Sequence, residues 1–194
     1  MTWNRFFSNI NEAVQIKSAH KAILLAPKLN ALPLPIQRYD EPFYPFSKEI
    51  IQATKHVVSA YIFDFASYLA TGGAGVIALE RSIRYAKDDA VTILHGPFVG
   101  TNYSVLADEI GFCVDALTIA RPEDISFYLE NPPYAPILAK DQQVAEIDTG
   151  GILTHNSLTL YNAPQKLTLT VYDNDFIAQY RSVDFAADIK KNIG

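Results

Sequence analysis

Polar side chains follow several predicted strands of this chain, at the position where α/β proteins usually bind a ligand. Arginine and lysine there suit a phosphate or a carboxylate, which favours a pocket for a small anionic metabolite or a nucleotide. A plainer interpretation is that Asp64 pairs with Arg121 or with His95, satisfying buried polar groups without any chemistry. We favour the plainer interpretation. The candidate ligand-binding residues are Asp64, His95, Asn102, Arg121 and Lys140.

Shorter motifs carry weaker signals. The glycine-rich run 72–75 precedes a predicted helix and could hold a phosphate, but it lacks the Lys-Ser/Thr end of a P-loop, so a tight turn explains it better. Residues 148–150 read Asp-Thr-Gly, as in aspartic proteases, yet a single carboxylate does not make the pair that those enzymes need. The single cysteine, Cys113, has apolar neighbours and is predicted to be buried. The histidines lack metal-ligand spacing, so we expect no metal and no cofactor.

The elements that must position these residues follow from apolar periodicity. Helical spacing predicts helices at 2–18, 46–59, 76–86, 104–111 and 123–130, the first with an apolar face that includes Ile16 and the second capped by Ser47. Apolar runs predict strands at 21–25, 60–66, 91–94, 116–120 and 136–139. Strands that alternate with helices favour parallel βαβ units, whose right-handed crossovers bring the C-terminal ends of the strands to one rim.

The pattern changes in the last quarter of the chain. Short β-type runs occupy 152–154, 157–161, 167–172 and 176–181, and the run 173–175 predicts a hairpin turn between the last two. Residues 184–191 predict a terminal helix, and the aromatic side chains of this region are expected to pack across strands. We place a boundary near Asp141. Residues 1–141 then form a barrel-like α/β domain, and 142–194 form a β-hairpin extension with a short terminal helix.

Ordered local patterns run through residues 41–129, at 42–46, 49–54, 60–61, 72–75, 78–80 and 115–119. Together they resemble the orotidine 5'-phosphate decarboxylase family. The resemblance implies a (β/α)₈ barrel that dimerises and works without metal or organic cofactor. It also implies an alternating Lys/Asp network at the ends of the strands. In that network a carboxylate destabilises the carboxylate of the substrate, and a lysine protonates the carbon that is left.

The positions that the resemblance assigns to this network carry other residues. Ala26 stands where the first strand should end in an aspartate, and Ile62 stands where the second should carry a lysine. His95, Pro97 and Gly100 replace the Asp-x-Lys-x-x-Asp run of the third strand. Proline and glycine have no side-chain group that transfers a proton, so we predict a relative that has lost the inherited chemistry.

The predicted parallel strands are too few for a complete eight-stranded barrel, and the family's late phosphate-binding loops have no clear counterpart. We therefore expect a partial or shortened (β/α) barrel-like parallel sheet with a C-terminal antiparallel β extension. Either the tail completes the barrel, or two chains complete each other. Because an open barrel exposes apolar edges that need cover, we expect a homodimer.

The composition narrows the remaining classes of function. A chain that is 49% hydrophobic and 19% charged is typical of an ordered globular protein. Its net charge of −5 and the lack of a Lys/Arg cluster argue against nucleic acid as a partner. No apolar run is long enough to span a membrane, the N-terminus lacks the features of a signal peptide, and a single cysteine suits the reducing cytoplasm.

Three hypotheses about function remain. The first is a catalytically inactive, decarboxylase-like protein that acts as a binding or interaction module, with a second copy of itself or another protein as its partner. The second is a binding protein or enzyme for a small anionic metabolite or nucleotide, with a rebuilt site around Asp64, His95 and Arg121. The third is an active decarboxylase of pyrimidine biosynthesis.

Overall fold

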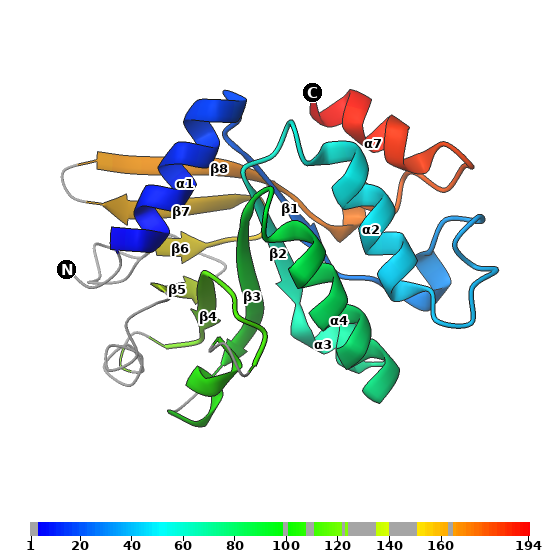
Figure 1. The fold of residues 1–194 in the computed structure, drawn as a ribbon, viewed down its shortest axis with the longest axis horizontal. Helices are drawn as coiled ribbons and strands as arrows, with labels where there is room; N and C mark the ends of the chain where they lie inside the picture. The colour runs from blue at the N-terminus through cyan, green and yellow to red at the C-terminus, as the bar shows by residue number, and fades with distance from the viewer. Residues whose placement is uncertain are drawn as a thin grey trace.

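The computed structural model describes residues 4–98, 101–107, 111–121, 123, 135–139, 151–162 and 165–194. Their strands form one closed barrel in the order β1 to β8 (Figure 1). The strands are β1 Lys21–Leu25, β2 Ala60–Asp64, β3 Val91–Phe98, β4 Ala116–Ile119, β5 Ala135–Ala139, β6 Gly151–Leu153, β7 Ser157–Asn162 and β8 Gln165–Tyr172. The helices are α1 Asn4–Lys17, α2 Phe43–Thr54, α3 Phe65–Leu69, α4 Gly73–Ala86, α6 Asn174–Ile177 and α7 Phe185–Ile193, with short 3₁₀ turns η1 Leu29–Ala31 and η2 Thr101–Leu106.

The tail completes the barrel within one chain. Strands β1 to β6 pair in parallel, β7 is antiparallel to both β6 and β8, and β8 returns to pair in parallel with β1. The predicted α/β barrel-like sheet with a small antiparallel part is therefore confirmed, and the first of the two predicted routes to closure is the one found. The predicted boundary near Asp141 lies outside the described residues, and strands on both sides of it share the one sheet.

The register of the strands decides which side chains face into the barrel. Ile62 lies opposite Ile93, and Asp64 lies opposite His95, so these four point to the same side of the sheet. Ile62 and Ile93 share an apolar cluster with the inward residues of the other strands. Tyr61, one residue away, belongs instead to the cluster under the outer helices. The barrel interior is thus an aliphatic core rather than a pore.

Helix α1 covers the end of the barrel where the strands begin. Phe6, Ile10 and Val14 recur at helical spacing and join the cluster of inward strand residues, which confirms the predicted helix at 2–18. Ile16, which we also assigned to the apolar face, is instead 74% exposed. Figure 1 shows α1 on one side of the strands and α2, α4 and α7 on the other.

Two buried tyrosine hydroxyls bond to α2. The Tyr68 hydroxyl lies 2.5 Å from Ser47 Oγ, and the Tyr61 hydroxyl lies 2.8 Å from Thr54 Oγ1. Burial raises the pKa of both phenols, so they stay neutral and can donate these bonds. Ser47 is therefore a buried residue within α2, and its predicted role as a helix cap is wrong because the helix already begins at Phe43.

The predicted hairpin turn at 173–175 is wrong. Asp173 Oδ1 accepts a hydrogen bond from the Phe176 backbone N–H at 3.0 Å, which makes Asp173 the cap of α6. Tyr172, Phe176 and Tyr180 lie four residues apart. The ring centroids of Tyr172 and Phe176 are 4.8 Å apart, and those of Phe176 and Tyr180 are 5.3 Å apart. Tyr172 ends β8 and Phe176 lies in α6, so these tilted ring contacts run from the strand across the short helix, and the three side chains pack on the core instead of pairing across a further hairpin.

Candidate functional site

The C-terminal rim of the barrel places Asp64 and His95 side by side. Asp64 ends β2, and its Oδ1 accepts the Ser67 backbone N–H at 2.8 Å, which starts α3. His95 lies directly opposite in β3, with Nδ1 3.0 Å from Thr118 Oγ1 in β4. We use "rim" below for Asp64, His95 and Thr118. The sequence predicted the first two as neighbours, and Thr118 is the residue that it missed.

Hydrogen bonds define how His95 is held. The Gly96 backbone N–H donates to Thr118 Oγ1 at 3.0 Å, and we assign the proton of that hydroxyl to the contact with His95 Nδ1. This assignment leaves the imidazole proton on Nε2. Burial lowers the pKa of His95, and the nearby Asp64 carboxylate offsets part of that effect. His95 is therefore a neutral, half-buried imidazole near pH 7.

The rim residues Asp64, His95 and Thr118 differ from a nucleophilic triad because the hydroxyl is not accessible. Thr118 is fully buried, and its oxygen already accepts the Gly96 N–H. A substrate could not reach that oxygen without opening the barrel. The bonds of Asp64 to Ser67 and of His95 to Thr118 instead satisfy polar groups at the strand ends, in line with the plainer interpretation of the sequence.

Two of the positions that the resemblance assigns to charged residues carry buried apolar side chains. Ala26 is 7% exposed and Ile62 is fully buried. Ile62 sits in the aliphatic layer below Asp64, where a lysine would have to lie among hydrocarbon side chains. Pro97 lies in β3 and Gly100 lies outside the described residues. Asp64 and His95 are the ionisable side chains that we find on the inward face of the described strands.

The remaining predicted site residues are Arg121, Asn102 and Lys140. Arg121 is exposed and forms an ion pair with Glu123, with Nε 3.8 Å from Oε1. Asn102 lies in η2, beyond the end of β3. Lys140 is outside the described residues, so its place at the rim stays a prediction.

The structure also accounts for the glycine-rich run 72–75 and for Cys113. Gly72 has φ of +65°, and a Cβ on Gly75 would lie 1.7 Å from the Tyr68 backbone oxygen, so both glycines serve a tight turn and close packing. Cys113 is half-buried, which corrects the prediction of full burial, and its Sγ lies 2.7 Å from Lys87 Nζ. The Asp-Thr-Gly run 148–150 lies outside the described residues.

Within the part of the chain that the structure describes, no three His, Cys, Asp or Glu side chains gather closely enough to hold a metal ion. None of the helices described is both long and apolar enough to cross a membrane.

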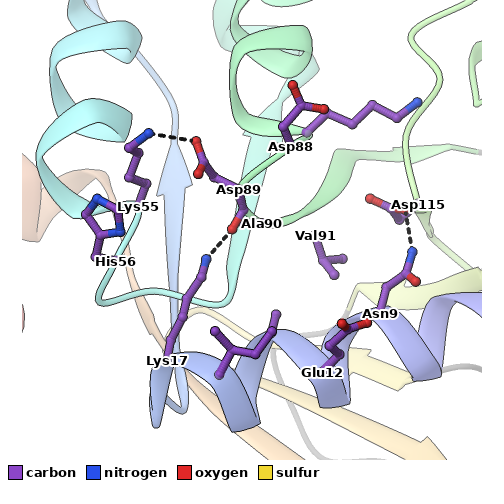
Figure 2. A pocket seen from close by; sticks show the side chains of 13 residues that line it. Asn9, Glu12, Lys17, Lys55, His56, Asp88, Asp89, Ala90, Val91 and Asp115 are labelled. Carbon is purple, nitrogen blue, oxygen red and sulfur yellow. Dashed lines mark hydrogen bonds and ion pairs between the residues drawn. The ribbon is translucent and has the colours of Figure 1, made fainter.

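A pocket that the sequence did not predict lies at the opposite end of the barrel. It has a volume of about 660 Å³ and opens between α1 and the segments that lead into β2, β3 and β4 (Figure 2). We call it the strand-start pocket. The sequence does hold a signal for this pocket, since charged or polar residues come shortly before three apolar strands. They are Lys55 and His56 before β2, Asp88 and Asp89 before β3, and Asp115 before β4.

Charged side chains in this pocket tie α1 to the barrel. Lys17, at the end of α1, donates from Nζ to the Val58 carbonyl at 2.8 Å and to the Asp89 carbonyl. Lys55 Nζ lies 3.1 Å from Asp89 Oδ2. The pKa of Lys17 is lowered, chiefly because burial disfavours its charged form. The negative charge of Asp89 raises that pKa and offsets part of the effect. These contacts connect three separate segments at one end of the barrel.

The fold and the rim define the class as a closed, mostly parallel eight-stranded α/β barrel. No protein-family model matches the chain. Over 132 residues it is 25% identical to the orotidine 5'-phosphate decarboxylase of Flavobacterium johnsoniae, a match that covers 68% of this chain and 45% of that protein. The chain therefore spans about half the length of this relative.

Solved structures with the same fold carry related names. A protein described as an orotidine-monophosphate decarboxylase from Toxoplasma gondii superposes with a TM-score of 0.63 at 22% identity, covering 75% of this chain and 51% of that one. The Plasmodium berghei orotidine 5'-monophosphate decarboxylase gives 0.60 at 15% identity, covering 73% and 62%. This chain is thus similar to orotidine 5'-phosphate decarboxylases in sequence and in fold, as the local patterns at 41–129 predicted.

Proposed function

We propose that this chain is a decarboxylase-like barrel that does not decarboxylate orotidine 5'-monophosphate and that acts by binding. The observation that carries the proposal is a pair of buried apolar residues, Ala26 just after β1 and Ile62 on the inner face of the barrel. They occupy the positions where the resemblance expects an aspartate and a lysine. Neither side chain can donate a proton or hold a charge.

The replacements at Ala26 and Ile62, and those at His95 and Pro97 in β3, bear on decarboxylation for an electrostatic reason. Decarboxylation of this kind leaves a carbanion that needs a fixed cationic proton donor in a site that excludes water. His95 is neutral because burial lowers its pKa, so it offers only a weak acid there. Asp64 is already used by the Ser67 N–H. Asp64 and His95 together do not supply the alternating positive and negative charges on which the chemistry of the decarboxylase family depends.

A turnover assay tests the proposal directly. The purified full chain is incubated with orotidine 5'-monophosphate, and the loss of its ultraviolet absorbance is followed beside a protein-free blank and an active decarboxylase. We expect no turnover above the blank. Turnover that the variant His95→Gln abolishes would contradict the proposal, because it would show that the rim performs the reaction with a different set of residues.

One observation favours a second candidate, a small anionic ligand bound at the rim. His95 is half-buried beside Asp64, and the exposed Arg121 follows β4 close by in the sequence. Uridine 5'-monophosphate and inorganic phosphate are suitable probes, read by the NMR shifts of the His95 ring. Saturable shifts that disappear in Arg121→Gln would support this candidate, and unchanged shifts at millimolar probe would contradict it.

Self-association is a separate part of the proposal. Because β8 pairs with β1 within the chain, an open edge no longer requires a partner. Support comes instead from exposed apolar side chains, including Leu34 at 66% and Val183 at 78% exposure. Sedimentation analysis of the full chain is expected to give a dimer. A monomer at high micromolar concentration would contradict this part alone.

A further inference from the structure

The strand-start pocket has the size and separation of charge of a small-molecule site. Its volume of about 660 Å³ falls within the range of ligand pockets, roughly 300–1,000 Å³. Figure 2 shows Lys17, Lys55 and His56 along one side and Glu12 and Asp115 along the other. We call these the basic end and the acidic end of the pocket.

Both ends retain hydrogen-bonding capacity after their own contacts are counted. A lysine ammonium has three protons, and Lys17 uses two of them on the Val58 and Asp89 carbonyls. Among the described residues, Lys55 Nζ contacts one carboxylate, that of Asp89, at 3.1 Å. The basic end can therefore donate at least one further hydrogen bond from each lysine to a bound carboxylate.

The acidic end is held in place by a neighbouring strand. Asp115 Oδ2 accepts both the backbone N–H and the hydroxyl of Thr92, each at 2.9 Å. Within the described ranges, its other oxygen, Oδ1, accepts a hydrogen bond from the Asn9 amide alone, at 3.5 Å, the long limit for such a bond. A fixed carboxylate with a nearly free oxygen is well suited to an ammonium group.

The overall charge of the lining limits the class of ligand. Three lysines face four carboxylates, so the pocket is close to neutral when His56 is neutral. A phosphate-rich ligand would meet the acidic end, and a metal ion would meet the lysines. Small apolar side chains lie between the two ends, with Ala13, Ala90 and Val91 in the lining. A ligand with opposite charges joined by a short apolar linker satisfies all three regions.

We propose that the strand-start pocket binds a small zwitterion, with its carboxylate at Lys17 and Lys55 and its ammonium at Asp115 and Glu12. This site is separate from the rim and does not depend on whether the rim has lost decarboxylation. The two proposals therefore fail independently. The turnover assay reports on the rim, and ligand titration reports on the strand-start pocket.

The test uses a series of linear ω-amino acids, from glycine to 6-aminohexanoate, titrated into the full chain and followed by calorimetry and NMR. Hexanoate and hexylamine serve as probes with one charge each. We expect one length in the series to bind about tenfold more tightly than either single-charge probe, because each charge-assisted bond adds to affinity. Equal affinity for the zwitterions and the single-charge probes would overturn the proposal, as would binding only of inorganic phosphate or Mg²⁺.

Variants locate the binding. Glu12→Gln and Lys55→Gln each change one end, and we expect about a tenfold loss of affinity for the best ω-amino acid in each. Lys28→Gln, an exposed lysine beyond the opposite end of β1, is the matched control and should leave affinity unchanged. Glu12 is exposed, so its variant is expected to fold normally. Unchanged affinity in both pocket variants would also overturn the proposal.

Discussion

The two ends of this barrel differ in where their charges lie. At the rim, Asp64 lies beside His95, which is neutral near pH 7, and the nearby Ala26 and Ile62 are buried and apolar. At the strand-start pocket, Lys17, Lys55, Asp89 and Asp115 engage one another or nearby backbone. The contrast teaches that ionic contacts can hold α1 to one end of a barrel while apolar residues lie just below the polar groups at the other end.

The aliphatic interior explains how the two ends can diverge. The inward layer that contains Ile62 and Ile93 separates them, and it depends on apolar burial rather than on either set of polar groups. Residues at the rim can therefore change without disturbing the contacts of α1. The predictions below test this separation, from the largest expected effect to the smallest.

Restoring the missing lysine should be strongly destabilising. We expect Ile62→Lys to lower the free energy of unfolding by about 3 to 5 kcal/mol, because a buried charge would lie among hydrocarbon side chains without a designed partner. Ile62→Met is the matched control and should cost less than about 1.5 kcal/mol. Urea unfolding measures both. If the lysine variant proved as stable as the methionine one, the rim would have to retain a network that neutralises it.

Helix α1 offers a matched pair at the other end. Ile10 is fully buried and Ile16 is 74% exposed in the same helix. Ile10→Ala should cost about 3 kcal/mol through lost burial and a residual cavity. Ile16→Ala should stay within about 0.5 kcal/mol of the parent. Equal losses in thermal or urea unfolding would show that α1 does not close the barrel as described.

Removing Lys17 should have an intermediate effect. Lys17→Met leaves the Val58 and Asp89 carbonyls without their donor, and we expect a loss of about 2 kcal/mol. Lys55→Met removes a partly exposed ion pair and should cost less than about 1 kcal/mol. Chemical unfolding of the two variants provides the comparison. A larger loss for Lys55 would mean that the ion pair, not the carbonyl contacts, fastens α1.

The smallest effect concerns pH and His95. Its pKa in the folded chain lies below the ordinary value of 6.5, so the unfolded chain takes up the proton first as the pH falls. His95 should therefore reduce stability as the pH drops through about 6.5 and below, by at most about 1.4 kcal/mol per pH unit. His95→Gln should flatten this part of the profile, measured by urea unfolding between pH 8 and 5. Asp64→Asn should steepen it, because the Asp64 charge supports the protonated form. A profile unchanged in both variants would contradict the assignment.

Local sequence patterns predicted much of the fold. The spacing of Phe6, Ile10 and Val14 located α1, and apolar runs located the parallel strands. The turn at 173–175 failed because Asp is as good a helix cap as it is a turn residue.

The candidate site was predictable only in part. Asp64 and His95 were expected together because consecutive parallel strands bring their C-terminal ends side by side, and the register does so. Thr118 was not expected, because its role depends on where its hydroxyl lies between the Gly96 N–H and the imidazole. The strand-start pocket escaped prediction because its residues come from α1 and three separate strand entries.

The sequence by itself determined the alternation of helices and strands, the resemblance to orotidine 5'-phosphate decarboxylases and the uncharged residues at positions where that resemblance expects charges, since each depends on residue type and local spacing. Only the tertiary structure decided that the tail closes the barrel, that Ile62 faces an aliphatic interior and that Lys17 meets Asp89. Those outcomes depend on strand register and on contacts between segments far apart in the chain, and local periodicity does not encode either.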